Sequence, residues 1–359
     1  MDKLRKIGII LLAVLIMPYT GCEESDDAGD SLIPENFIVD IPDALSYNSA
    51  NGRISEDEIN GGLVYALLGV YIYFGEASAL LVQEFITFLR THPGLTKLDT
   101  FTFTSDEDGR TKKATVEENG TYDGKSYQYK LTVWDEDETM AFQLFWNKSP
   151  ISGVAIMSPY NIDRTNEYVN PELMYRLEYS EDNANYEKVM IVSVSKHELF
   201  DEDGIDNFKM HVGKQGDIVE IFGNSNHPTI TIIGNNYNGA RNYAFVGRAD
   251  EANDIGVAQV AMPPSSVVTN EGIFENYSIR KVLEEEVFIA FGTSLPSILD
   301  PFLVNSDPPG YFVKGKGFEG SGDNVPDDTG FTEEFIDLSN LKPYVPNSIQ
   351  YMSVDFADD

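Results

Sequence analysis

The chain has 359 residues and a formal net charge of −34 at neutral pH, from 25 basic and 59 acidic side chains. Nucleic-acid-binding proteins neutralise phosphates with clustered lysines and arginines, and no such cluster is present, so we exclude this function. A single cysteine excludes internal disulfides, so a chain that is 42% hydrophobic must be stabilised by a packed core.

The first 21 residues have the composition of a signal peptide. Three basic residues precede an apolar run, residues 7–17, which is too short to cross a membrane as a helix. Small residues then lead to Cys22, and the segment resembles a bacterial lipoprotein signal, although Tyr19 stands where leucine is usual. The resemblance implies cleavage before Cys22 and a durable membrane anchor of fatty chains, such as palmitate, on its sulfur. The alternative is an ordinary secreted protein that is cut elsewhere.

Residues 22–53 are expected to form an acidic tether between this anchor and the fold. The acidic run at residues 23–27 resembles the export signal of Bacteroidota surface lipoproteins, which implies an outer-membrane protein that faces the cell exterior. A solvated charged linker and retention in the periplasm are the alternatives. Ser31, between Asp30 and Leu32, fits the short O-glycosylation pattern of the same phylum.

The most apolar stretch of the mature chain follows the tether. Residues 55–58 (Ser-Glu-Asp-Glu) have a capping-box pattern that predicts a helix start, and residues 92–94 (His-Pro-Gly) predict its end. Between them, residues 63–89 predict one or two helices that are buried on most sides, with Gly75 as the point of division. A membrane span is disfavoured because glycines and polar residues, including Glu76, interrupt the stretch.

From residue 101 to residue 262 the pattern changes to short alternating runs separated by Asp-Gly, Asn-Gly or acidic turns, which predicts antiparallel strands. The clearest hairpin has a loop at 135–138 and is predicted to pair Val133 with Met140, Leu131 with Phe142, Tyr129 with Leu144 and Tyr127 with Trp146, all on one face. Further strands are expected at 101–104, 113–117, 153–157, 173–179, 188–195, 207–212, 217–222, 229–233, 243–248 and 256–262. Hairpin-length links favour a meander over a parallel sheet.

Residues 279–291 predict a second amphipathic helix, and residues 293–359 predict an irregular segment packed on the domain at 54–292. Edge strands within that segment are expected at 302–304, 311–313 and 349–354. The fold class is therefore α+β and mainly antiparallel β, with a curved meander sheet packed around a long apolar helix. This arrangement resembles the lipoprotein-carrier fold of LolA and LolB at the level of shape.

Candidate ligand sites are few. Asp201, Asp203 and Asp206, around Gly204, could present several oxygens to calcium, although Asp and Gly also favour plain turns. Trp134 and Phe145 could form a small exposed platform for sugars, although packing against a neighbouring element is the commoner outcome for aromatic side chains. No other cofactor is indicated.

The sequence predicts a lipid-anchored binding or assembly protein of the cell surface, because an anchor and a large core are present and no convincing catalytic constellation is found. The membrane, reached through Cys22, is one expected partner; an outer-membrane protein or a glycan is another. One alternative is a carrier or chaperone for an apolar ligand held between the long helix and the sheet. Others are a glycan-capture component of a polysaccharide-uptake system and a hydrolase.

Overall fold

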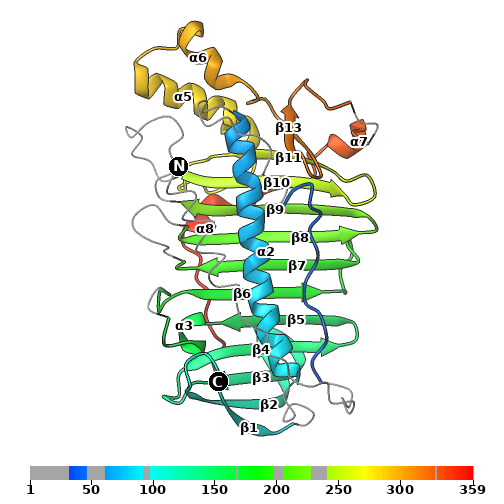
Figure 1. The fold of residues 1–359 in the computed structure, drawn as a ribbon, viewed down its shortest axis with the longest axis vertical. Helices are drawn as coiled ribbons and strands as arrows, with labels where there is room; N and C mark the ends of the chain where they lie inside the picture. Colours follow the sequence, from blue (N-terminus) through cyan, green and yellow to red (C-terminus); the bar gives the residue numbers. More distant parts are fainter. Residues whose placement is uncertain are drawn as a thin grey trace.

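The computed structural model describes residues 32–46, 61–91, 98–166, 169–197, 205–227, 241–327 and 330–358. Within these residues, thirteen strands form one open antiparallel sheet in which every strand lies beside its neighbours in the sequence (Figure 1). The strands are β1 (Thr100–Thr104), β2 (Thr111–Tyr122), β3 (Lys125–Trp134), β4 (Met140–Lys148), β5 (Ile151–Met157), β6 (Met174–Ser180), β7 (Lys188–Ser195), β8 (Asn207–Gln215), β9 (Ile218–His227), β10 (Arg241–Asp250), β11 (Ile255–Ala261), β12 (Gly310–Val313) and β13 (Gly317–Ser321).

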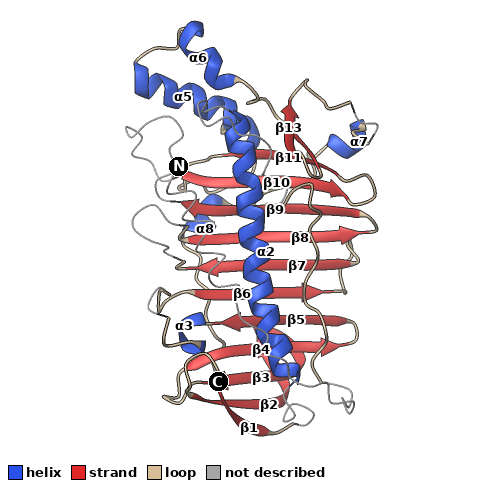
Figure 2. Cartoon of the chain, viewed as in Figure 1, coloured by secondary structure: helices blue, strands red, loops and turns tan. Residues whose placement is uncertain are grey.

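Seven helices accompany the sheet in the described part of the chain (Figure 2): α2 (Gly61–Thr91), α3 (Pro159–Ile162), α4 (Ile273–Asn276), α5 (Ile279–Phe291), α6 (Pro296–Leu303), α7 (Glu333–Ile336) and α8 (Pro346–Gln350). The predicted fold class is confirmed. The predicted strand at 188–195 and the predicted helix at 279–291 have the bounds expected from the sequence. The predicted helix cap at 55–58 and the predicted strand at 229–233 lie outside the described residues.

Helix α2 crosses the strands and packs on one face of the sheet (Figure 1). Its 31 residues make it about 46 Å long, close to the span of about nine strand spacings, and it contacts strands from β5 to β13. Tyr71 stacks on Tyr243 with ring centroids 4.2 Å apart, and Phe74 meets Phe208 edge-on at 5.1 Å. Burial of these aromatic rings makes the layer between helix and sheet the main core.

Among the described residues, α2 is the one helix long and apolar enough to cross a bilayer. This is weak evidence for a membrane span, because core helices of soluble proteins pass the same test, and 67% of its most apolar window is buried in the fold.

Gly75 does not divide the helix, contrary to the sequence prediction. The residue faces the sheet, where an added Cβ would overlap the end of Met210 and lie 3.0 Å from Phe208. Glycine at this position therefore permits close approach of helix and strand rather than a break.

The register of the β3–β4 hairpin differs from the prediction by two residues. Val133 pairs with Phe142 and Leu131 with Leu144. The loop spans residues 135–139, one residue more than predicted, and a bulge at Val133/Trp134 shifts the pairing by one further residue. An even shift leaves Leu131, Val133, Phe142 and Leu144 on the predicted apolar face. Tyr127, which was predicted to pair with Trp146 on that face, instead clusters with Phe145 and Val154 on the other side of the sheet.

Two expected edge strands are wrong. Residues 302–304 overlap the end of helix α6, and residues 349–354 overlap helix α8 and an extended segment that pairs with no strand. Proline at the first turn of each helix favours helical backbone there. The strand expected at 311–313 is present as β12 and extends the sheet.

Residues 331–358, which we call the C-terminal strap, pack on the face of the sheet opposite α2, the outer face. Side chains of the sheet hold the strap by its backbone: Asn207 Nδ2 donates to the carbonyls of Ile349 (2.8 Å) and Met352 (3.1 Å). Gln143 both accepts from the N–H of Ala357 (2.8 Å) and donates to its carbonyl (3.3 Å). Consecutive residues of β8 therefore point to opposite faces of the sheet: Phe208 faces α2 and Asn207 faces the strap.

Candidate binding groove

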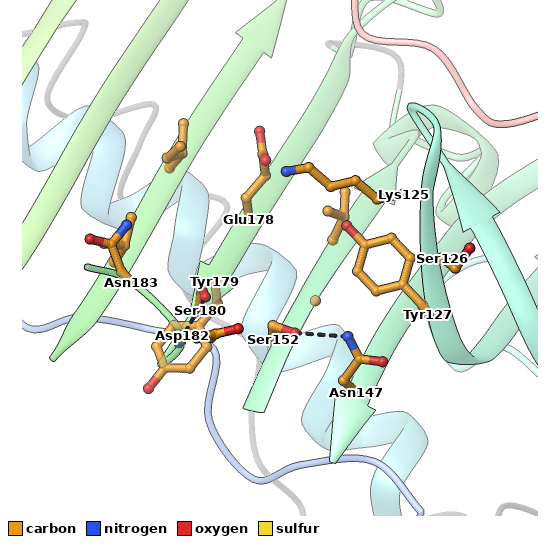
Figure 3. Close-up of a pocket in the computed structure, with 14 residues that line it drawn as sticks. Lys125, Ser126, Tyr127, Asn147, Ser152, Glu178, Tyr179, Ser180, Asp182 and Asn183 are labelled. Carbon is orange, nitrogen blue, oxygen red and sulfur yellow. Dashed lines mark hydrogen bonds between the residues drawn. The ribbon is translucent and has the colours of Figure 1, made fainter. Parts of the chain in front are cut away.

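A solvent-open hollow of about 520 Å³ lies on the outer face, across β3 to β7 (Figure 3). This is the volume range of ligand sites in proteins. Its polar lining includes Lys125, Tyr127, Asn147, Ser152, Glu178, Ser180, Asp182 and Asn183, and its apolar floor includes Val154, Val189 and Ile191. We call this set the polar groove.

Cross-strand register builds the floor of the groove. Val154, Glu178 and Ile191 are paired across β5, β6 and β7, and Ser152, Ser180 and Val189 form the next row. Residues two apart on a strand share a face, so both rows point to the same side of the sheet. The meander therefore places polar side chains of β5 and β6 beside aliphatic side chains of β5 and β7 on one surface.

The β2–β3 turn and strand β4 provide one wall of the groove. Asp123 and Gly124 both have positive φ, 48° and 73°, which is the backbone of a tight Asp-Gly hairpin turn. This turn starts β3 so that Lys125 extends toward Glu178 across the hollow (Figure 3). Beside it, Asn147 Nδ2 donates to Ser152 Oγ at 3.0 Å.

The loop between β6 and β7 forms the opposite rim. Asn183 Oδ1 accepts from the backbone N–H groups of Asn185 (2.9 Å) and Tyr186 (3.3 Å), which gives the loop a defined turn. The ring of Tyr186 lies over Gly213, where a Cβ would be only 2.7 Å from it, and its hydroxyl donates to Glu220 Oε2 at 2.7 Å. Beyond Tyr186 lies a second hollow of about 640 Å³.

The charges around the groove are partly paired. Arg176 lies 3.1 Å from Glu178 and 2.8 Å from Asp123, and its guanidinium covers the ring of Tyr122 at 4.8 Å. Burial, and then the negative charge of Glu178, raise the pKa of Tyr127 above its ordinary value. Its hydroxyl is therefore protonated at neutral pH and can donate a hydrogen bond. The groove is lined by amide, hydroxyl, carboxylate and ammonium groups, all of which can form hydrogen bonds with a ligand.

A second concentration of charge lies at the β1–β2 and β3–β4 turns. Lys112 Nζ is 2.9 Å from both Asp108 Oδ2 and Asp135 Oδ1, and Asp135 also pairs with Arg110 at 2.8 Å and Arg164 at 3.2 Å. Because each buried carboxylate already has cationic partners, this cluster joins two turns and α3 and is not a candidate ligand site.

Most site residues predicted from sequence lie outside the described residues: Cys22, Ser31, Asp201 and Asp203. Asp206 is described; its Oδ1 is buried and has no hydrogen-bond partner within the described part of the chain. In the same part, no three His, Cys, Asp or Glu side chains group as metal ligands. Calcium at residues 201–206 therefore stays a prediction.

The predicted aromatic platform is not formed. Phe145 is fully buried beneath Tyr122 and Tyr127, whose ring centroids are 5.4 and 5.9 Å away, and the strap residue Val354 belongs to the same cluster. Trp134 is paired with Met140, at the opposite end of the hairpin from Phe145, and Lys113 Nζ lies 5.4 Å from its ring. The C-terminal strap is distant from these strands in the sequence. It buries a face of the sheet that the strand pattern alone predicts to be exposed to solvent.

Sequence reasoning missed the groove residues because none forms a motif along the chain. The available signal was weak. Ser152 and Val154 are two apart on one strand, Glu178 and Ser180 on the next, and Val189 and Ile191 on the third, and only the pairing of the strands places them in one hollow.

Fold and site together define an antiparallel meander-sheet protein with a polar groove on the outer face of its sheet. Comparisons of the chain with models of known families, with curated proteins and with solved structures found no match.

Proposed function

We propose that the protein is a lipid-anchored binding protein of the cell surface and that the polar groove is its ligand site. The anchor is supported by the lipoprotein-like sequence that ends at Cys22. The observation that carries the binding site is the pair of cross-strand rows, which set Glu178, Ser152 and Ser180 among aliphatic side chains in an open hollow. Such convergent polar groups on an apolar floor are the usual composition of a binding site.

The anchor is tested by growing cells with a radioactive fatty acid. The expected result is a labelled protein in the membrane fraction, with no label on a Cys22→Ala variant, because the sulfur is the attachment atom. An unlabelled wild-type protein, or a free thiol on secreted material, would remove the anchor from the proposal.

A glycan is the ligand class that the groove chemistry favours. Sugar hydroxyls donate and accept hydrogen bonds, which the carboxylates of Glu178 and Asp182 and the amides of Asn147 and Asn183 can satisfy. The C–H faces of a sugar would contact Val154 and Ile191 on the floor. Capture of a glycan for a polysaccharide-uptake system is therefore the second candidate function.

Glycan binding is tested on an array of neutral polysaccharides, followed by titration of the best ligand. We expect Glu178→Gln to weaken binding about tenfold or more, because hydrogen bonds to charged groups contribute about 1.5–3 kcal/mol and 1.4 kcal/mol is a factor of ten. Tyr127→Phe is expected to weaken it about two- to tenfold, because a hydrogen bond between neutral groups contributes about 0.5–1.5 kcal/mol. Trp134→Ala is the control, since that aromatic ring lies outside the groove. Equal losses in all three variants, or no ligand on the array, would contradict glycan capture.

Carriage of an apolar ligand between α2 and the sheet has no supporting observation. At Gly75 the helix lies in close contact with Met210 and Phe208 of the sheet, and the layer on either side is filled by buried side chains such as Tyr71 and Phe74. We therefore do not propose this function.

A further inference from the structure

Helices α5 and α6 form a hairpin that projects past the end of the sheet (Figure 1). The first part of α5 is held by the fold, since Ile279, Val282 and Leu283 belong to the main core. Gly292, at φ 66°, ends α5 and turns the chain back into α6. The ring of Phe291 then meets Phe302 of α6 at 6.0 Å, which ties the two helices together.

The far part of this hairpin exposes large apolar side chains. Phe288 is 57% exposed, Phe291 52% and Leu295 59%, and α6 has no buried residue. Asp300 is the sole charged residue from position 287 to position 306, in a chain of which 23% is charged. Several large apolar side chains exposed on one hairpin of a very acidic protein indicate an interaction site.

The form and composition of the surface favour a bilayer over a protein partner. The hairpin is convex and projecting, with phenylalanine and leucine at its exposed end, which suits insertion into the boundary between headgroups and acyl chains. With one charge in twenty residues, it offers almost no ion pairs to select a protein partner.

The position of the tether allows the hairpin to reach the membrane. The first described residue, Leu32, is held at β4, where its carbonyl accepts from Trp146 Nε1 at 2.8 Å. The ten residues from Cys22 to Leu32 can span at most about 33–36 Å. The seven strand steps from β4 to β11, beside the hairpin, measure about 34 Å. An anchor at Cys22 and the hairpin can therefore touch one membrane when the long axis of the sheet lies along it.

We propose that the exposed end of the α5–α6 hairpin docks into the surface of the bilayer that holds Cys22, so that the protein has two membrane contacts. This inference rests on the proposed lipid anchor. The net charge of −34 repels anionic headgroups, so the surface is expected to prefer zwitterionic lipid.

The first test measures the hairpin without the lipid. The full mature chain carrying Cys22→Ser is mixed with phosphatidylcholine vesicles and floated on a density gradient. We expect measurable flotation that falls at least tenfold in the double variant Phe291→Ser, Leu295→Ser. The matched control is Val268→Ser, Tyr351→Ser, because these side chains are 75% and 74% exposed elsewhere on the molecule. Equal flotation of the two double variants, or no flotation of the parent, would overturn the proposal.

The second test places an indole at the docking surface. In the lipidated protein on vesicles with brominated acyl chains, Phe291→Trp should add a fluorescence component that is quenched more strongly than that of the native Trp134 and Trp146. A hairpin that instead pairs with a second copy would leave this component unquenched and double the mass in solution, which would also overturn the proposal. Fatty-acid labelling without quenching would reject the hairpin and keep the anchor; flotation without labelling would do the reverse.

Discussion

Replacing Lys112 with methionine is expected to lower the free energy of unfolding by about 3–5 kcal/mol, the usual result of removing one partner from a buried ion pair. Lys112 is 3% exposed, and its two carboxylate partners, Asp108 and Asp135, have no exposed side-chain surface. Nζ also donates to the carbonyl of Asn161 at 3.1 Å, which ties the cluster to α3. Methionine fills the space of the lysine stem but leaves both carboxylates with less positive charge around them.

Urea unfolding at neutral pH would measure this loss, with Lys113→Met as the matched control. Lys113 is the next residue on the same strand and is exposed, so its substitution should change stability little. Similar unfolding midpoints for the two variants would show that the buried cluster does not stabilise the fold.

The same cluster predicts the response to acid. Burial by itself would raise the pKa of Asp135, but hydrogen bonds from Arg110 and Lys112 outweigh it and hold the pKa well below its ordinary value. A carboxyl whose pKa is depressed by folding contributes stability that is complete above its unfolded pKa, about 3.9, and is lost as pH falls toward the folded value. The difference between wild type and Lys112→Met should therefore shrink below about pH 4.

Replacing Glu76 with glutamine is expected to stabilise the protein at alkaline pH. Glu76 lies on α2 near Asp40 and Asp43 of the N-terminal segment, and Lys314 is 3.9 Å from Asp43. Burial, and then the charges of the two aspartates, raise the pKa of Glu76 to about 8. The folded protein thus keeps a proton that the unfolded chain releases near pH 4.5.

The sign of the effect follows from proton binding. Between about pH 4.5 and 8 the folded state holds more protons at this position than the unfolded state, so the stability of the wild type falls as pH rises through that window. Glutamine cannot ionise, so the Glu76→Gln variant should lack this decline and exceed the wild type by about 2–4 kcal/mol at pH 9.

Urea unfolding at several pH values from 5 to 9 would measure the two slopes. Glu84→Gln is the control on the same helix, since Glu84 is exposed and its substitution should change the slope far less. Parallel slopes for wild type and Glu76→Gln would mean that Glu76 is already ionised in the folded protein.

The periodicity of side chains along the chain was sufficient to predict the antiparallel strands and both main helices. Alternation at residues 188–195 predicted β7, and helical spacing over residues 279–291 predicted α5, because both patterns depend on near neighbours in the sequence. The long apolar stretch at residues 63–89 likewise predicted one or two buried helices, because a helix that is apolar on most sides must be covered by other parts of the fold.

The strand register, the covering of the outer face and the polar groove depended on contacts between residues that are distant in the sequence. A loop one residue longer than predicted and the bulge at Val133/Trp134 together moved the β3–β4 pairing by two residues. No local pattern distinguishes two registers that keep nearly the same face buried. The strap buried Phe145 from more than 200 positions away, through Val354. Val154, Glu178 and Ile191 became one groove floor only when the meander placed β5, β6 and β7 side by side.

The sequence by itself therefore determined which segments are strands and helices and which of their faces are apolar, because local alternation and spacing decide both. The tertiary structure alone decided which faces stay open to solvent and which polar side chains meet, because these depend on strand order and on segments that return from far along the chain.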